Sequence, residues 1–188
     1  LEKDEKVNIR PIACGSAIWR IATRSMAKVM APVVNEKIGD YQLATGNEGG
    51  ATKGYQRIVD ILERNQGNVI LSLDLKNAFN TIDMVSVREH VRGILGEWFV
   101  LIEGWIEEER DHYYWDEKGK RHRVRATTGL DQGDPLSAVI APCAFDKVLG
   151  TIDKEFHRIS YQDDAYVIGD KGNIKKGFRE IGMELNIK

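Results

Sequence analysis

The pattern of apolar and polar positions divides the chain into predicted strands and helices. Short apolar or alternating runs are typical of β-strands, and apolar residues spaced three and four positions apart are typical of amphipathic helices. The first pattern predicts strands over 69–75, 112–115, 121–127, 158–161 and 165–168. The second predicts helices over about 16–30, 52–64, 84–95, 97–110, 135–149 and 173–183. Strand pairs with helices between them indicate an α+β fold.

The apolar positions also predict which side chains the helices bury. In helix 16–30 the apolar and small residues at helical spacing are Ile18, Ile21, Ala22, Ser25, Met26 and Val29. The predicted inner positions of the next three helices are Tyr55, Ile58, Val59 and Leu62, then Val87, Val91 and Ile94, then Phe99, Ile102 and Ile106. Each set forms one apolar stripe, as expected for a helix that packs on a core.

Residues that favour helix ends and breaks refine these ranges. Ser16 can cap the first helix, and Asp134 followed by Pro135 can begin the helix over 135–149. Pro142 lies inside that helix and has no backbone N–H, so it is predicted to kink the helix or to free a carbonyl. A polar, Gly-rich stretch over 36–52 predicts a surface loop, and residues 3–12 can form a polar hairpin.

Composition adds limits to this picture. A length of 188 residues fits one domain, and 42% apolar with 30% charged residues is ordinary for a soluble globular protein. No apolar run approaches a membrane span. Cys14 and Cys143 have no disulfide or zinc spacing, which indicates a reducing compartment. The absence of an initiating Met indicates a piece of a longer protein.

The charge is distributed unevenly. A net charge of −2 argues against nucleic-acid binding, yet residues 1–28 hold six basic side chains against three acidic ones, and 118–125 hold five against none. Arg20, Arg24 and Lys28 would form a stripe along the first helix. Both basic segments are either solvated surfaces or contacts for phosphates.

Acidic residues end two of the predicted strands. Asp163 and Asp164 lie at the tip of the hairpin 158–168, and Asp74 ends the buried strand. Adjacent carboxylates repel each other and lose hydration, so a divalent cation is the expected counter-charge. The alternatives are a solvated acidic turn for the pair and a helix cap for Asp74.

Five stretches occur in order along the chain. They are Arg10-Pro11-Ile12, Asp-Leu-Lys-Asn-Ala-Phe-Asn over 74–80, Gly-Leu-Asp-Gln-Gly-Asp-Pro-Leu-Ser over 129–137, Tyr-Gln-Asp-Asp over 161–164 and Gly-Met-Glu-Leu-Asn over 182–186. Together they resemble the reverse transcriptase family, and within it the branch of non-LTR retrotransposons and group II introns. The resemblance implies a right-hand polymerase, with fingers elements over 1–68 and, over 69–188, a palm whose antiparallel sheet is backed by helices. The thumb would follow beyond the chain.

The resemblance also implies catalytic roles. Asp74, Asp163 and Asp164 would hold two Mg²⁺ ions, for which Mn²⁺ can substitute. The bound ions would support the transfer of deoxynucleotides to a primer 3′-hydroxyl. Lys3 and Arg10 would grip the incoming triphosphate. Phe79 would exclude a 2′-hydroxyl, although it is also consistent with a core aromatic, and Gln132 would border the nascent base pair. Residues expected to contact the template and primer are Arg20, Arg24, Lys28, Arg121, Arg123, Arg125 and Tyr161, the last near the primer end.

The resemblance names partners and leaves alternatives open. The partners are an RNA template, a DNA or RNA primer, dNTPs and the rest of a longer polypeptide with a thumb and, as a further option, an endonuclease; no membrane is implied. A retrotransposon product would act in the nucleus. The other function classes are an inactive scaffold derived from a reverse transcriptase, an RNA-dependent RNA polymerase and a nucleotide cyclase. The intact acids argue against the scaffold, Phe79 against the RNA polymerase, and the Gln132 loop with the basic fingers against the cyclase.

Overall fold

The computed structural model describes residues 11–74, 77–107, 109–176 and 178–179. The predictions for Lys3, Arg10, most of the 3–12 hairpin and the stretch 182–186 lie outside these residues. The elements are α1 (Ala17–Lys37), α2 (Gly50–Arg64), β1 (Asn68–Asp74), α3 (Ala78–Thr81), α4 (Met84–Leu95), the 3₁₀ helix η1 (Gly96–Leu101), α5 (Glu103–Glu107), β2 (Arg110–Trp115), β3 (Arg121–Ala126), α6 (Ser137–Leu149), β4 (His157–Tyr161) and β5 (Asp164–Asp170). None of the described helices is long and apolar enough to cross a membrane.

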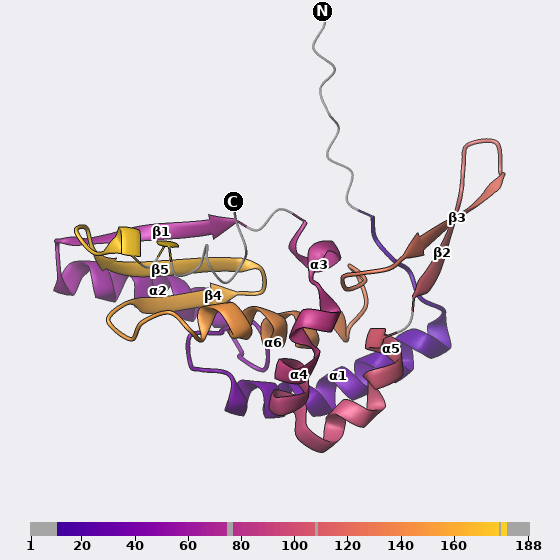
Figure 1. Cartoon of the computed structure of the whole chain (residues 1–188), viewed down its shortest axis with the longest axis horizontal. Coiled ribbons are helices and arrows are strands. Elements are labelled where there is room, and N and C mark those ends of the chain that lie inside the picture. The colour runs from indigo at the N-terminus through magenta and orange to yellow at the C-terminus, as the bar shows by residue number, and fades with distance from the viewer. Residues whose placement is uncertain (1–10, 75–76, 108, 177, 180–188) are drawn as a thin grey trace, which may run out of the picture.

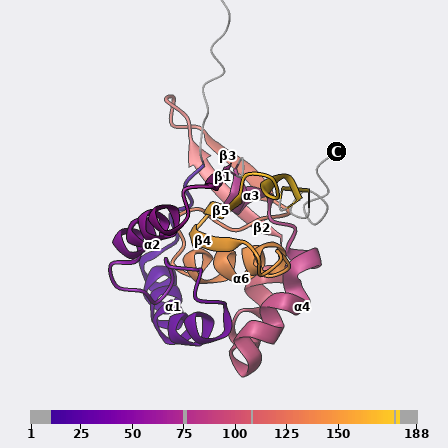
Figure 2. The ribbon, with the colours of Figure 1, turned by 90° about the vertical axis from the view of Figure 1, so that its left-hand side faces the viewer.

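The strands form two antiparallel sheets. In the larger sheet β5 lies between β1 and β4, and in the smaller one β2 pairs with β3. The predicted hairpins over 112–127 and 158–168 are therefore confirmed. The β2–β3 hairpin projects from the body of the molecule, whereas the larger sheet is part of that body (Figure 1, Figure 2).

Helices cover both faces of the larger sheet. On one face Ala165 and Val167 of β5 belong to the main core together with the buried side chains of α6. On the other face Ile159 and Ile168 pack against α2 through Ile58, Ile61 and Leu62. Neighbouring residues of β5 thus point to opposite helices, as the two-residue period of a strand requires.

Helix α1 buries only part of the face that its apolar pattern favours, since Met26 packs against the core but Ile21 and Val29 are exposed. Thr23, Met30 and Val34 are buried, whereas Ile18 is 83% exposed. The buried residues lie seven and four positions apart, on the stripe that meets α4 and α6. The helix also continues to Lys37, so its C-terminal half makes the contacts that a helix ending near residue 30 could not make. The large exposed apolar side chains of α1 are Ile18, Trp19, Ile21 and Val29.

The segment over 97–110 is not the single helix that was predicted. It contains η1 and the short helix α5, and Arg110 already belongs to β2. The predicted inner residues Phe99, Ile102 and Ile106 are nevertheless buried. Phe99 and Ile102 lie three positions apart, the spacing at which side chains align on a 3₁₀ helix, and the Ile102 N–H donates to the Phe99 carbonyl at 3.0 Å. The three-residue spacing of a 3₁₀ helix therefore explains why Phe99 and Ile102 are buried on the same side.

Pro142 frees a carbonyl without ending its helix. Helix α6 runs unbroken past the proline, which has no N–H to donate to the Ala138 carbonyl four residues before it. The Thr45 hydroxyl donates to that carbonyl instead, at 3.1 Å. Thr45 is itself buried, so the exchange satisfies both polar groups and ties the 41–47 segment to α6.

The two cysteines are both free, as their spacing predicted. Cys14 is exposed, while Cys143 is buried in α6, where burial raises the pKa of its thiol. A raised pKa keeps the thiol protonated and unreactive at neutral pH.

Asp83 caps α4, and its replacement is expected to destabilise the protein. Its carboxylate accepts the Val85 N–H at 3.1 Å and the Ser86 N–H at 3.4 Å. Asp83→Ala should lower the free energy of unfolding by about 1 kcal/mol at pH 7. The hydrogen bonds from Ser86 hold the pKa of Asp83 below its ordinary value, so the contribution is complete above about pH 4 and lost as the pH falls through the lowered pKa. Urea unfolding of both proteins at pH 7 and pH 3 measures the difference, and an unchanged difference at pH 3 would contradict this origin.

Candidate active site

Asp74 and Asp164 lie directly opposite each other at one end of the larger sheet. They are register partners in the antiparallel pair of β1 and β5. Directly opposite residues share a face, with Cβ atoms about 4.5–5.5 Å apart. Ile70 and Ile168 are paired farther along the same face, where Ile168 is buried beside α2, but Asp74 and Asp164 are exposed. The sheet therefore presents two opposed carboxylates at its open end.

The third predicted acid, Asp163, lies in the adjoining turn. Tyr161 pairs with Asp164 across β4 and β5, so Gln162 and Asp163 form a two-residue connection. Gln162 has a φ of +55°, a conformation that costs a residue with a side chain about 1–2 kcal/mol. Its Oε1 atom is buried without a hydrogen-bond partner among the described residues. A strained backbone with an unsatisfied polar atom is typical of a functional site, and no local sequence pattern indicates either feature.

The donor set of this sheet end fits a hard divalent cation. It consists of carboxylates, the oxygen ligands that Mg²⁺ prefers. Opposed like charges destabilise a strand pair, and a cation would remove that cost. Within the described residues, however, no three His, Cys, Asp or Glu side chains converge closely enough to hold a metal ion. The acids thus lie at one end of the sheet, but their side chains do not form a complete metal-coordination site.

The loop over 129–134 docks on the segment that follows β1. The Leu130 N–H donates to the Phe79 carbonyl at 2.7 Å, and the Gly129 N–H donates to the Ile82 carbonyl at 2.9 Å. Gly129 has a φ of +76°, and a Cβ there would come within 2.7 Å of the Asn80 Cα atom. Only glycine permits this approach. Phe79 and the Gln132 loop are thereby joined, and α3 follows the end of β1 that carries Asp74 (Figure 1).

The N-terminal segment lies on the same loop. The Ala13 N–H donates to the Gln132 carbonyl at 2.9 Å, and a Cβ at Gly133 would meet the Ala13 carbonyl at 3.0 Å. Trp19 Nε1 donates to an Asp134 carboxylate oxygen at 2.7 Å. These contacts place the chain after Arg10 beside Gln132. The ring of Phe79 is partly buried against the core, which agrees with its interpretation as a core aromatic.

Asp131 joins the loop to the base of the β2–β3 hairpin. Its Oδ1 atom lies 3.1 Å from Arg110 Nε and 3.1 Å from His112 Nε2. Arg110 also donates to the Gly129 carbonyl at 2.7 Å and lies over the Trp105 ring. The sequence patterns did not predict this cluster, because nothing in the local pattern around 131 points to residues 110 and 112.

Of the predicted nucleic-acid contacts, Tyr161 lies beside the acids, whereas the basic residues lie on α1 and on the hairpin. Arg20, Arg24 and Lys28 are exposed along α1, with no ion pair to another described residue. Arg123 and Arg125 lie on the hairpin, where both pair with Asp111. The two hydrogen bonds that Arg123 donates to the Asp111 carboxylate raise the pKa of Arg123. The guanidinium groups predicted to bind phosphates are therefore partly occupied in this structure.

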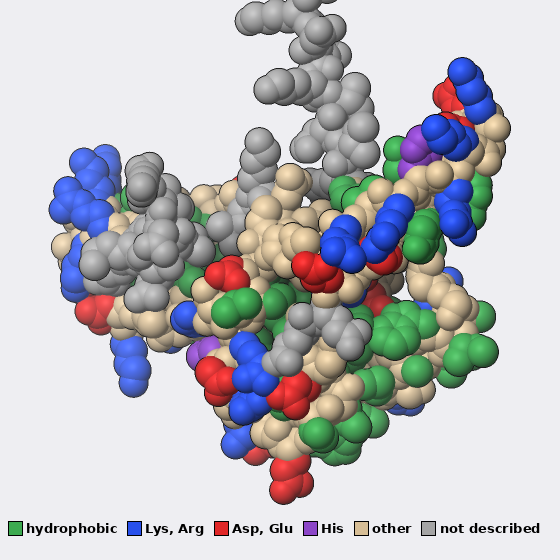
Figure 3. Space-filling view, turned by 45° about the vertical axis from the view of Figure 1, so that its right-hand side comes forward, with side chains coloured by type: hydrophobic (Ala, Val, Ile, Leu, Met, Phe, Trp, Pro, Cys, Tyr) green, Lys and Arg blue, Asp and Glu red, His purple; other side chains and the backbone are tan. Residues whose placement is uncertain are grey.

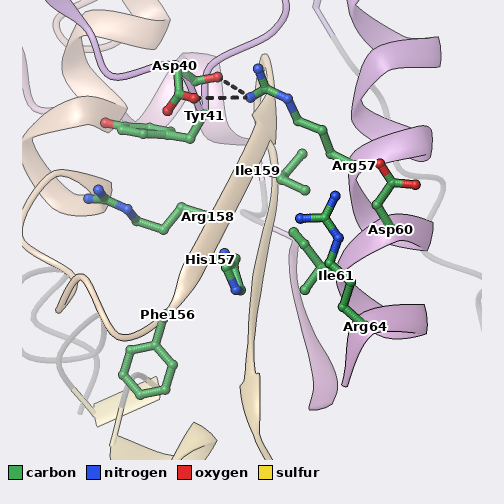
Figure 4. Close-up of a pocket in the computed structure, with 10 residues that line it drawn as sticks. All are labelled: Asp40, Tyr41, Arg57, Asp60, Ile61, Arg64, Phe156, His157, Arg158 and Ile159. Carbon is green, nitrogen blue, oxygen red and sulfur yellow. Dashed lines mark hydrogen bonds and ion pairs between the residues drawn. The ribbon is translucent and has the colours of Figure 1, made fainter. Parts of the chain in front are cut away.

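A polar cleft of about 340 Å³ lies at the other end of the sheet (Figure 4). Arg57 reaches across it to Asp40 and donates to the Asp40 carbonyl at 2.6 Å. Strand β4 begins at this cleft and ends at Tyr161 beside the acids. Of the predicted site residues that the structure describes, none lines the cleft. Its lining consists of Asp40, Tyr41, Arg57, Asp60, Ile61, Arg64, Phe156, His157, Arg158 and Ile159.

Three telomerase structures are similar to this fold. The chain matches apo telomerase from Candida Tropicalis truncated from its C-terminal domain, at a TM-score of 0.60 and 13% identity, over 89% of this chain and 37% of that one. It also matches apo telomerase from Candida Tropicalis, at a TM-score of 0.60 and 13% identity, over 85% of this chain and 32% of that one. Telomerase from Candida albicans in complex with a TWJ fragment of telomeric RNA matches at a TM-score of 0.53 and 12% identity, over 87% of this chain and 32% of that one. The chain thus spans about a third of these proteins, and the predicted α+β fold of a right-hand polymerase is confirmed.

Sequence comparison gives the family. A search of curated proteins found no match to the chain. The family model described as reverse transcriptase (RNA-dependent DNA polymerase) matches residues 1–184, nearly the whole chain. This match agrees with the motif order around Asp74, Gln132 and Asp163. The chain belongs to the reverse transcriptase family.

Proposed function

We propose that the chain is the fingers and palm portion of an RNA-directed DNA polymerase. In this proposal residues 1–68 supply fingers elements and residues 69–188 supply the palm. The observation that carries it is the register of β1 and β5, which brings Asp74 opposite Asp164 and beside the turn that holds Asp163. These acids lie about ninety positions apart in sequence, yet they meet at the exposed end of one sheet.

The three acids act as metal ligands in this proposal. Two bound Mg²⁺ ions would supply activation of the primer 3′-hydroxyl and neutralisation of charge on the departing pyrophosphate. Asp74 and Asp164 present carboxylates from neighbouring strands, and Asp163 adds a third from the strained turn. Tyr161 precedes that turn and is exposed, which supports a contact with the primer end.

The nucleotide site adjoins the acids. Gln132 and Gly133 border the nascent base pair, and Phe79, held by the Leu130 N–H, limits the space at the sugar so that a deoxynucleotide is selected. Lys3 and Arg10 bind the triphosphate. The contact of Ala13 with Gln132 supports this, because it brings the segment after Arg10 to the loop.

Nucleic acid lies along the basic surfaces. Arg20, Arg24 and Lys28 on α1, with Arg121, Arg123 and Arg125 on the hairpin, contact the phosphates of template and primer, which makes binding salt-dependent and tolerant of sequence. RNA as the template agrees with the family description and with the telomeric RNA of the Candida albicans complex. The motif order around 129–137 and 161–164 favours a non-LTR retroelement as the source.

Primer extension tests the proposal. The longest polypeptide that carries this chain is incubated with poly(rA)/oligo(dT), Mg²⁺ and either dTTP or UTP. Extension with dTTP and not with UTP supports an RNA-directed DNA polymerase, and replacement of Mg²⁺ by Mn²⁺ should preserve it. Extension with UTP alone would indicate an RNA polymerase. No product with either nucleotide, together with no metal-dependent nucleotide binding, would overturn the proposal in favour of an inactive scaffold.

A further inference from the structure

The β2–β3 hairpin carries aromatic and basic side chains on one face. Register partners share a face, so Trp115 lies beside Arg121 and Tyr113 lies beside Arg123. Tyr113 is 47% exposed and Trp115 is 64% exposed. The Arg121 guanidinium lies over the Tyr113 ring, 5.0 Å from its centroid. We call the set Tyr113, Trp115, Arg121, Arg123 and Arg125 the aromatic face of the hairpin.

This face keeps a positive charge after its internal ion pairs are counted. Asp111 and Glu109 pair with Arg123 and Arg125. No ion pair joins Arg121, or Lys118 and Lys120 at the tip, to an acid among the described residues. Figure 3 shows Lys and Arg side chains along the projecting hairpin, with apolar, His and acidic side chains among them. These cations suit a partner that carries a regular negative charge.

Contacts within the chain hold the hairpin at its tip, along its strands and at its base. At its tip Asp116 accepts the N–H groups of Lys118 and Lys120, at 3.0 and 2.9 Å, and lies 2.8 Å from His122 Nε2. On the face opposite the aromatic face, Tyr114 and His122 stack with centroids 4.9 Å apart. At the base, Asp131 holds the hairpin to the Gln132 loop. A ligand would therefore meet rings that are already positioned, at little cost in ordering.

We propose that the aromatic face of the hairpin binds unpaired bases of a nucleic-acid strand, which stack on Trp115 and Tyr113 while Arg121, Lys118 and Lys120 contact the phosphates. Exposed aromatic rings with interspersed cations form the stacking platforms of single-strand binders. Bases within a duplex stack on one another and leave no free face, so the rings select unpaired nucleotides. Lys is depleted at protein interfaces, whereas Lys118 and Lys120 lie at the tip of this hairpin. The inference rests on the proposed function, in which the single strand is the template.

Fluorescence anisotropy with short labelled RNA tests the inference on the 188-residue chain. Trp115→Ala and Tyr113→Ala should each weaken binding of single-stranded RNA about 5- to 150-fold in Kd, the range for one stacked base. Trp115→Phe keeps a ring and should restore most of the affinity. Tyr55→Ala, which removes an aromatic ring that is 70% exposed on α2, is the matched control and should leave Kd unchanged.

Binding of duplex RNA and the salt dependence of Kd distinguish base stacking from other modes of binding. The alanine variants should bind duplex RNA as the unsubstituted chain does and should keep the same dependence of log Kd on log salt, since no phosphate contact is removed. Equal weakening for single strand and duplex, no weakening for either, or self-association of the chain through the hairpin would each overturn the inference. Asp163→Asn separates this from the proposed function: it should bind single-stranded RNA normally. Normal stacking without nucleotide addition by the unsubstituted polypeptide would overturn only the polymerase proposal.

Discussion

Asp163→Asn is expected to abolish primer extension while the protein stays folded. Asparagine keeps the size of the side chain but removes one of the negative charges gathered at the end of the larger sheet. Loss of one group that stabilises charge in a transition state costs about 10²–10³-fold in rate, and a metal ligand should cost at least that much. The turn has few packing contacts to lose, because Asp163 is neither in a strand nor in the core. Primer extension and circular dichroism measure the two effects.

Thermal unfolding in Mg²⁺ gives a readout that does not depend on catalysis. A cation that binds only the folded state raises its melting temperature, so Mg²⁺ should stabilise the unsubstituted protein and not Asp163→Asn. Without Mg²⁺, Asp164→Asn should raise the melting temperature slightly, since it removes a like charge directly opposite Asp74. Asp60→Asn removes one exposed charge from α2 and serves as the control for charge alone. Full extension by Asp163→Asn would refute its assignment as a ligand.

The strands and their acids were predictable, whereas the register was not. Apolar or alternating runs identified β1, β4 and β5, because each strand turns at least one face toward a hydrophobic cluster. That Asp74 lies opposite Asp164 depends on pairing between segments about ninety residues apart, which no local pattern encodes. The motifs predicted that these acids lie close together, and the pairing of β1 with β5 places Asp74 opposite Asp164.

Helix faces were predicted only where tertiary contacts agree with local hydrophobicity. Helix α4 buries Val91 and Ile94 as expected, but α1 leaves Ile18 exposed and buries Thr23. A hydrophobic pattern shows which face could be buried. Which face is buried depends on where α4 and α6 lie, and the residues of α1 that join the main core lie between Met26 and Val34.

The supporting contacts of the site were missed for a related reason. Asp131 lies inside a motif that draws attention to Gln132, yet its partners Arg110 and His112 belong to a strand some twenty residues earlier. The local pattern predicts Gln162 only as part of a tight turn, although its positive φ and unpartnered Oε1 mark it as unusual among the described residues. Pro142 is the exception, because a missing N–H is a local fact and the freed carbonyl followed from it.

Gly129→Ala is expected to separate the Gln132 loop from the Phe79 segment. A residue with a side chain at φ +76° costs about 1–2 kcal/mol, and its Cβ would also overlap the backbone of Asn80. The overlap is with main chain, which cannot move as the end of a flexible side chain can. The hydrogen bonds of Gly129 and Leu130 to Ile82 and Phe79 should therefore break or lengthen.

This displacement should affect stability and activity together. We expect Gly129→Ala to lower the free energy of unfolding by at least about 2 kcal/mol, the sum of strain and lost hydrogen bonds, and to lower primer extension by about 10²-fold, the cost of a misplacement near 1 Å. Gly93→Ala is the matched control, because Gly93 lies in α4 with open space around it and should gain about 0.5–1 kcal/mol from higher helix propensity. Urea unfolding and extension assays on both variants compare them. If Gly129→Ala unfolds like the unsubstituted chain and extends normally, the loop does not depend on this contact, and the placement of Gln132 beside the nucleotide loses its support.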